Sequence, residues 1–158
     1  VNIKGEKYMS KDVGDGMTVT DFVNYAGFDS GSLYQYYDLT PMNRPYPEIL
    51  ENATKEFDNI TSKLNLVSYP HVSVGWDANP RYNYIHPNVC RENTPENVKK
   101  GFEYAKKYID EHPSLPAPLI TVNSWNEWTE TSYLHPDDLY GYGYLEAIKK
   151  VFVDEEDV

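Results

Sequence analysis

The chain has 158 residues, the size of one domain, and a formal net charge of −11. This acidic balance argues against a nucleic-acid partner, because a surface that contacts phosphates needs a basic footprint. No apolar run reaches the roughly 18 residues that a membrane-spanning helix requires, and a lone cysteine, Cys90, leaves no partner for an internal disulfide. We therefore expect no nucleic acid and no membrane span.

The sequence pattern of residues 18–64 predicts a strand with one helix before it and one helix after it. Residues 1–17 are polar and glycine-rich without a period, which favours irregular structure. Residues 18–27 indicate a short helix that ends at Gly27, and residues 28–37 indicate a strand that runs into a loop. The spacing of apolar residues over 46–64 predicts the next helix.

Two further strands and two further helices follow. Residues 66–77 predict a strand, and the Pro, Asn and Arg content of residues 78–93 predicts a long loop. Residues 94–109 give the clearest helix, residues 119–124 the third strand and residues 144–153 the last helix. Thr94 is a good N-cap for the clearest helix, and an acidic tail occupies residues 154–158.

The alternation of strands and helices over residues 18–153 predicts an α/β fold with parallel β/α units in a single domain, residues 1–158. Ligands of such folds bind at the carboxyl ends of the strands. The three predicted strands end in Y-Q-Y-Y, G-W-D and W-N-E-W-T-E. The aromatic and polar residues at these ends and in the following segment predict a glycan-binding surface made of Tyr34, Tyr36, Trp76, Asp77, Trp125, Asn126, Trp128, Tyr133 and Tyr142. Asp77 has a second interpretation, as a cap of the loop that follows it.

Glu127 and Glu130 are the candidate catalytic residues. A pair of carboxylates serves glycoside hydrolysis at a separation of about 5 to 5.5 Å in retaining enzymes and about 6.5 to 9.5 Å in inverting ones. Residues three apart point to opposite faces of a continued strand, so the two carboxylates share one cleft only if the chain turns after Asn126. Trp125 and Trp128 would then desolvate one glutamate and keep it protonated as an acid. The alternative is a solvated loop whose glutamates meet nearby cations.

No metal site and no cofactor are expected. His86, His112 and His135 lack metal-ligand spacing, and His71 is interpreted as a structural residue within a strand. The Y-G-Y-G-Y segment, residues 140–144, lacks the full dinucleotide fingerprint and a preceding strand.

Several motifs together resemble the WbsX-like proteins, which are similar to glycoside hydrolase family 99 and often labelled lipopolysaccharide-biosynthesis glycosyltransferases. The motifs are A-G-F-D (26–29), V-S-V-G-W-D-A-N-P-R (72–81), S-W-N-E-W-T-E (124–130), Y-L-H-P-D (133–137) and Y-G-Y-G-Y-L-E-A (140–147). The resemblance covers residues 19–151 and implies a (β/α)8 TIM barrel that acts on glycans.

The resemblance to endo-α-mannosidases of family 99 also implies roles for the two glutamates. Glu127 would act as a base on the 2-hydroxyl of the substrate and give an anhydro-sugar intermediate. Glu130 would act as the general acid on the leaving oxygen and then as the base for water, so that stereochemistry is retained. The chain departs from the family pattern in two places, with Thr131 in place of Gly and His135 in place of Glu. We expect the first to change the turn that aims Glu130, and the second to remove a polar contact or to alter specificity.

A complete TIM barrel needs about 250 residues, so this chain is expected to be the C-terminal part, about the last three β/α units, of a longer barrel. Its expected partners are a carbohydrate substrate and either the missing N-terminal part of the barrel or a second copy, because a short parallel sheet leaves open edges. Two rivals to the retaining hydrolase stay open: a glycosyltransferase of surface polysaccharide biosynthesis and a non-catalytic glycan-binding module. Cytoplasmic, periplasmic and secreted locations in a bacterium also stay open.

Overall fold

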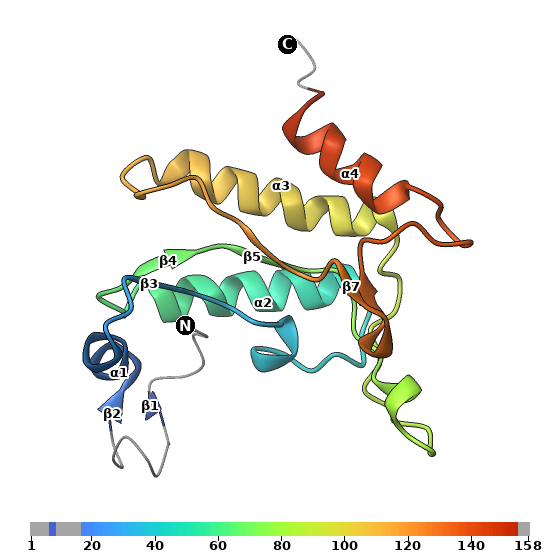
Figure 1. Cartoon of the computed structure of the whole chain (residues 1–158), viewed down its shortest axis with the longest axis horizontal. Coiled ribbons are helices and arrows are strands. Elements are labelled where there is room, and N and C mark those ends of the chain that lie inside the picture. The colour runs from blue at the N-terminus through green and yellow to red at the C-terminus, as the bar shows by residue number, and fades with distance from the viewer. Residues whose placement is uncertain (1–6, 9–16, 155–158) are drawn as a thin grey trace.

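The computed structural model describes residues 7–8 and 17–154, which form a mixed α/β chain. Its helices and main strands alternate along the sequence (Figure 1). The helices are α1 (Val19–Ala26), α2 (Tyr46–Thr61), α3 (Pro95–Glu111) and α4 (Gly143–Phe152). The main strands are β3 (Ser30–Ser32), β4 (Val67–Tyr69), β5 (His71–Ser73) and β6 (Thr121–Asn123).

The main strands pair in parallel, as the sequence predicts. β3 pairs with β4 and β5 pairs with β6, and only Pro70 separates β4 from β5. The two ladders therefore lie on opposite edges of one extended segment, residues 67–73. α2 lies between β3 and β4 in the chain, and α3 lies between β5 and β6, so each forms a β/α crossover.

The helices begin and end close to their predicted bounds, because signals that are local in the sequence, such as capping residues, determine where each helix begins and ends. The Thr94 hydroxyl accepts a hydrogen bond from the backbone N–H of Asn97, 3.3 Å away, and caps α3. Gly27, with φ of +72°, follows the last residue of α1 in the left-handed conformation that glycine adopts without strain. α2 ends at Thr61, three residues before the predicted end.

The strands are shorter than the sequence predicts. The first predicted strand, residues 28–37, forms a ladder only over Ser30–Ser32 and then turns into the 3-10 helix η1 (Tyr36–Asp38). Residues 1–17 were expected to be irregular, yet Lys7–Tyr8 forms β1, which pairs antiparallel with β2 (Met17–Thr18). The other residues of that segment, and residues 155–158 of the acidic tail, lie outside the described residues.

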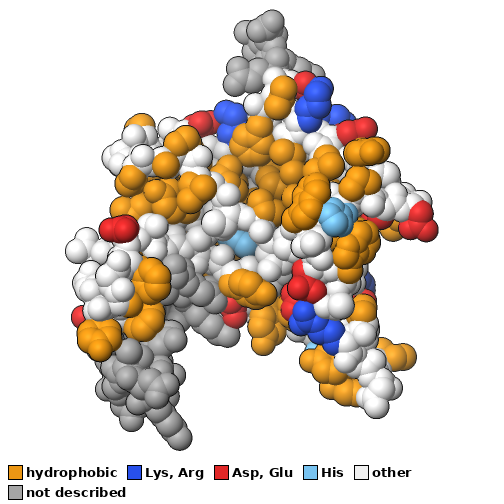
Figure 2. Space-filling view, viewed as in Figure 1, with side chains coloured by type: hydrophobic (Ala, Val, Ile, Leu, Met, Phe, Trp, Pro, Cys, Tyr) orange, Lys and Arg blue, Asp and Glu red, His pale blue; other side chains and the backbone are white. Residues whose placement is uncertain are grey.

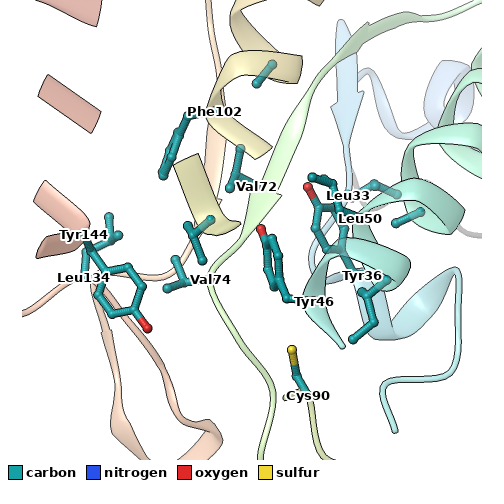
Figure 3. Packing of buried hydrophobic residues seen from close by; sticks show 14 of the residues in the cluster. Leu33, Tyr36, Tyr46, Leu50, Val72, Val74, Cys90, Phe102, Leu134 and Tyr144 are labelled. Carbon is teal, nitrogen blue, oxygen red and sulfur yellow. The ribbon is translucent and has the colours of Figure 1, made fainter. Parts of the chain in front are cut away.

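One face of the central segment packs against the helices. Val72 and Val74 lie two positions apart, at the end of the segment and just after it, so their side chains point to the same face. Both are buried in a core with Phe102 of α3 (Figure 3). Tyr46 of α2 lies in the same core, and its hydroxyl donates a hydrogen bond of 2.8 Å to the backbone oxygen of Ser73. Burial raises the pKa of Tyr46 well above its usual value, so the hydroxyl stays a neutral donor.

The other face of the strands carries buried polar side chains that bond to one another. His71 and Ser73 point to this face, opposite Val72 and Val74. The two imidazole nitrogens of His71 lie 2.9 Å from Thr121 Oγ1 and 3.0 Å from Ser73 Oγ. Thr121 Oγ1 also lies 2.6 Å from Ser32 Oγ of β3, so side chains from three strands meet on this face. Burial lowers the pKa of His71 to about 3, which keeps it neutral, and agrees with its interpretation as a structural residue.

Among the described residues, no helix combines the length and the apolar character that a membrane crossing requires.

Candidate active site

The two candidate glutamates lie on a short hairpin that follows β6. β7 (Asn126–Glu127) pairs antiparallel with β8 (Ser132–Tyr133), and the 3-10 helix η3 (Trp128–Glu130) with Thr131 forms the turn between them. A turn after Asn126 was the condition under which both carboxylates could face one cleft, and the structure places the turn one residue later, after Glu127. The turn removes the strand geometry that would point the two glutamates to opposite faces.

Serine hydroxyls fix the hairpin to the end of β6. Ser124 Oγ donates a hydrogen bond of 2.7 Å to the backbone oxygen of Ser132 and accepts one of 3.0 Å from the backbone N–H of Glu127. Ser132 Oγ donates a hydrogen bond of 2.8 Å to the backbone oxygen of Asn123. Because Ser132 is fully buried, these bonds hold the backbone of Glu127 in a defined position.

Arg81 joins both glutamates, and sequence reasoning gave it no role. Its Nη1 lies 2.6 Å from Glu130 Oε1, and its Nη2 lies 3.1 Å from Glu127 Oε1. Its Nε donates a hydrogen bond of 2.8 Å to Thr129 Oγ1, which in turn donates one of 2.5 Å to Glu127 Oε1. All three guanidinium nitrogens therefore contact one loop, and they bring the two carboxylates to the same side of it.

The two glutamates differ in their surroundings. The side chain of Glu130 is 6% exposed, whereas that of Glu127 is 37% exposed. The hydrogen bond from Thr129, helped by the charge of Arg81, lowers the pKa of Glu127. Glu130 Oε2 is buried and has no hydrogen-bond partner among the described residues. A buried oxygen without a partner is costly, so Oε2 is the atom of this site that is ready to bond to a ligand.

The loop that carries Arg81 is tied to the hairpin. Asp77 accepts hydrogen bonds from the backbone N–H of Asn79 at 2.8 Å and from its side-chain amide at 2.6 Å, at the start of the 3-10 helix η2 (Asn79–Arg81). The backbone N–H of Asp77 donates to the backbone oxygen of Glu130 at 2.7 Å. Of its two interpretations, the structure therefore places Asp77 as a cap of the loop, which orients Arg81.

Glycine is required where this loop leaves β5. A Cβ atom on Gly75 would lie 2.6 Å from the backbone oxygen of Thr131, closer than such atoms approach. Gly75 thus lets the two loops pack backbone against backbone.

Thr131 adopts the left-handed conformation, with φ of 50° and ψ of 38°, directly after Glu130. This is where the resembling proteins carry Gly, and a β-branched residue is strained there. Thr131 keeps a glycine-like backbone, and its hydroxyl lies 3.3 Å from the backbone oxygen of Asp77.

Thr131→Gly is expected to raise the free energy of unfolding by about 1 kcal/mol. The relieved strain of about 1–3 kcal/mol is partly offset by the backbone entropy of glycine and by the lost hydroxyl contact. Urea unfolding of the variant and the wild type measures the difference. Thr131→Ala is the control, because it loses the hydroxyl but keeps the left-handed strain, and it should not gain stability. A glycine variant less stable than the wild type would contradict this account.

Aromatic side chains surround the hairpin. Trp128 stacks on Tyr133 with ring centroids 3.8 Å apart, and Trp125 meets the His135 ring edge-on at 4.6 Å. Trp76, in the loop after β5, stacks on Tyr37 at 4.8 Å with nearly parallel rings. Figure 2 shows hydrophobic side chains beside acidic and basic ones on this side of the molecule.

A hollow of about 360 Å³ lies between the strand ends and the hairpin. It is lined by residues of β5, β6 and β7 and of the segments that follow β3 and β6, namely Leu33, Tyr34, His71, Thr121, Val122, Asn123, Ser124, Asn126 and Glu127. Larger hollows of about 540 and 690 Å³ lie along α2, α3 and α4, and none of the predicted site residues lines them. Of the predicted catalytic residues, Glu127 lines the hollow at the strand ends and Glu130 does not.

The structure brings together most, not all, of the predicted site residues. Tyr34 and Asn126 line the hollow with Glu127, while the side chains of Trp125, Trp128 and Tyr133 pack around the hairpin.

Two predicted residues lie elsewhere. Tyr36 is 1% exposed and donates a hydrogen bond of 2.9 Å to the backbone oxygen of His71, so it is a core residue and not a surface residue as expected. Tyr142 is exposed just before α4, and no described contact links it to the glutamates.

Sequence reasoning missed Arg81, Thr129 and the position of His71 in the lining of the hollow. The only available signal for Arg81 was its place at the end of the W-D-A-N-P-R motif. Among residues 7–8 and 17–154, no group of three or more His, Cys, Asp or Glu side chains is arranged to hold a metal ion.

Comparisons with known proteins agree with the resemblance. The uncharacterized protein WxcX from two strains of Xanthomonas campestris pv. campestris is 32% identical over 97 residues, which is 57% of this chain and 13% of WxcX. This chain thus matches only a small part of the length of those relatives.

Two solved structures of an endo-α-mannosidase of glycoside hydrolase family 99 from Bacteroides thetaiotaomicron, one of them in complex with Bis-Tris-propane, are also similar. The sequence identity is 16% and the TM-score is 0.46. The matches cover 82% of this chain and 40% and 38% of the two solved chains. The sequence pattern of the family described as glycosyltransferase WbsX matches residues 13–148. Because that match spans most of the sequence, the chain belongs to the WbsX family.

Proposed function

We propose that this chain carries the catalytic carboxylate pair of a glycan-active enzyme, a retaining glycoside hydrolase with Glu127 and Glu130 as its catalytic residues. The observation that carries the proposal is that both carboxylates meet at the guanidinium of Arg81, at the carboxyl ends of parallel strands, and that Glu130 is buried there, unlike a glutamate of a solvated loop. Exposed indoles of Trp125 and Trp128 beside the pair suit the stacking of sugar rings.

The surroundings of each glutamate support a different role. Glu127 has a lowered pKa and is ionised at neutral pH, as a base must be. Glu130 is buried, and its Oε2 has no partner among the described residues, so this oxygen is the one that can meet the leaving oxygen of a substrate. Oε1 of Glu130 can accept from Arg81 at the same time. In the proposed ligand-bound state, Arg81 thus binds Oε1 and holds it in place, and Oε2 is the oxygen that exchanges the proton with the substrate.

In the first proposed step, Glu127 takes the proton of the substrate 2-hydroxyl, and the 2-oxygen attacks the anomeric carbon. The bond to the leaving oxygen breaks, and Glu130 Oε2 gives that oxygen its proton. In the second step, Glu130 takes a proton from water, and the water oxygen attacks the anomeric carbon. The bond between that carbon and the 2-oxygen breaks, and Glu127 returns its proton to the 2-oxygen. Two inversions at one carbon give retention.

The fold of the whole enzyme is part of the proposal. The described residues supply two parallel crossovers, β3–α2–β4 and β5–α3–β6, followed by α4. We propose that they form the C-terminal units of a (β/α)8 barrel whose other strands lie in the rest of the protein or in a partner chain. The polar side chains of His71, Ser73 and Thr121 would then face the inside of that barrel.

A glycosyltransferase is the second candidate, since the family to which the chain belongs is described as one. A nucleotide-sugar donor needs a site for its diphosphate, commonly cationic groups or a metal ion. The guanidinium of Arg81 is bonded to carboxylates here, which favours the hydrolase.

The test compares the full-length protein with its Glu127→Gln and Glu130→Gln variants. Each substitution is expected to lower the hydrolysis of an α-linked oligosaccharide by about 10²–10⁴-fold, because it removes a proton-transfer group. Glu103→Gln on the exposed side of α3 is the matched control and should not change the rate. The anomer first formed, followed by NMR, should match that of the substrate.

Other outcomes separate the rivals. Turnover that needs a nucleotide sugar would favour the transferase. Oligosaccharide binding without turnover, unchanged in both glutamine variants, would favour a binding module.

A further inference from the structure

The imidazole of His135 contacts both exposed tryptophans of the hairpin. Its Nδ1 lies 3.2 Å from Nε1 of Trp128, and its ring meets the ring of Trp125 edge-on, at an interplanar angle of 84°. The backbone N–H groups of Leu134 and His135 both donate to the backbone oxygen of Trp125, at 3.1 and 3.2 Å. His135 is therefore placed by the backbone next to one indole and bonded to the other.

The hydrogen bond fixes the state of the imidazole. An indole N–H can only donate, so Nδ1 must be the acceptor. His135 is thus neutral in this arrangement, and its proton is on Nε2. Among the described residues Nε2 has no partner, so the donor that it carries is available to an oxygen atom of a ligand.

Tyr133 completes the arrangement on one side of Trp128. The rings stack at 3.8 Å, and the Tyr133 hydroxyl donates a hydrogen bond of 3.0 Å to Asp137 Oδ2. Tyr133 therefore covers one face of the indole, while Trp128 as a whole keeps 45% of its surface exposed. Trp125 keeps 53%. Two indoles in fixed relative orientation, each with open surface, match the apolar faces of a sugar ring.

The position of these indoles ties them to the two carboxylates. Trp128 lies between Glu127 and Glu130 in the chain, at the start of the 3-10 helix that carries Glu130. Residues 124–142 contain Asp137 and Asp138 besides the pair and contain no Lys or Arg, and Arg81, from the loop after β5, already contacts both carboxylates of the pair. This charge disfavours an anionic sugar.

We propose that His135 is a positioning residue that holds Trp128 and Trp125 as two walls of a stacking subsite for an uncharged hexopyranose ring next to the glutamate pair. The subsite rests on the proposed function in one respect, that the pair and the stacked ring belong to the same glycan. The positioning itself is a property of the hairpin and does not depend on turnover.

The first arm of the test observes the hydrogen bond directly, in full-length protein labelled at the tryptophan indole nitrogens. The Trp128 signal is identified by its loss in Trp128→Phe. In His135→Leu this signal is expected to move to the position of an indole N–H that is bonded only to water. In His135→Gln, whose side-chain oxygen can accept, it is expected to stay near its wild-type position.

Should the leucine variant fail to fold, His135→Phe replaces it, because phenylalanine keeps a ring beside Trp125 but cannot accept the hydrogen bond. A Trp128 signal that does not move in the variant that folds overturns the positioning.

The second arm measures affinity by calorimetry in the Glu127→Gln background, where turnover does not consume the probe. The probes are α-linked mannotriose, isomaltotriose and cellotriose. For the probe that binds, His135→Leu is expected to weaken Kd by about 5–10-fold and Trp128→Leu by at least as much, while His135→Gln stays within about twofold. Equal affinities in all variants, or no binding of any probe to the parent, overturn the subsite. Binding that responds to these variants in a protein without hydrolase activity supports the subsite and overturns the proposed function alone.

Discussion

Arg81→Gln is expected to lower kcat for glycan hydrolysis by about 10²-fold and to move the acidic limb of the pH–rate profile to higher pH. The guanidinium supplies contacts to both carboxylates and to Thr129, and glutamine can replace at most one of them. Arg81 is also one of the causes that lower the pKa of Glu127. Without it this pKa rises, so the base is protonated, and activity is lost, at a higher pH than in the wild type.

Two matched variants separate the effect of the hydrogen-bond geometry at Arg81 from the effect on the pKa of Glu127. Arg81→Lys keeps the positive charge but loses the planar fork, so the pH limb should stay near the wild-type value while kcat falls. Thr129→Val keeps the shape of the side chain but removes the hydrogen bond that is the largest cause of the lowered Glu127 pKa. It should move the pH limb upward with a smaller loss of kcat, because Arg81 still holds Glu130.

Far-UV circular dichroism and thermal unfolding of each variant show that the fold is intact. If Arg81→Gln leaves kcat and the pH limb unchanged, Arg81 is only a surface ion-pair partner, and the role that we give it in the proposed mechanism is lost.

The candidate glutamate pair could be predicted from the sequence, but Arg81, which contacts both carboxylates, could not. Glu127 and Glu130 are three positions apart beside two tryptophans, and composition at the end of a strand is a local signal. Arg81 is 49 positions from Glu130, and their contact depends on how two loops pack at the ends of β5 and β6. The close approach at Gly75 that permits this packing has no signature in the sequence.

Helices were predicted well because caps and apolar spacing are encoded locally. Thr94 and Gly27 mark helix bounds through their own backbone preferences. Strand ends are instead set by the neighbouring strand. The ladder beside β3 ends at Tyr69, just before Pro70, so the first strand ends at Ser32, well short of the predicted residue 37.

The prediction that Tyr36 lies on the surface was wrong, because the aromatic pattern at the end of the first strand does not reveal that the polar face of the strands is buried. Alternation of Val72 and Val74 with His71 and Ser73 is typical of a strand with one face in the core and one in water. Here both faces are buried, and the polar residues satisfy one another across three strands. Tyr36 follows the first strand in this buried layer, so an aromatic residue that resembled a ligand platform is a core residue.

The buried imidazole of this layer gives the second large effect. His71 is expected to make the protein lose stability as the pH falls from about 6.5 toward 3, by roughly 2 kcal/mol at about pH 5. The sign follows from its pKa, which burial lowers to about 3 in the folded protein and which is about 6.5 in the unfolded chain. The unfolded chain therefore binds a proton in this window and the folded protein does not, so acid favours unfolding. Above about pH 6.5 both states are neutral at this residue, and its contribution no longer changes with pH.

His71→Asn isolates this effect, because an amide can still bond to Thr121 or Ser73 but does not titrate. Urea unfolding of both full-length proteins at several pH values between about 8 and about 5 gives two curves of stability against pH. The variant is expected to start lower at the alkaline end, because asparagine fills the site less well, and to lose less stability on acidification. The difference between the curves removes the contributions of the other histidines and the carboxylates, which both proteins share. Parallel curves would mean that His71 can become charged in place, which in turn requires that the polar face open to water before the rest of the protein unfolds.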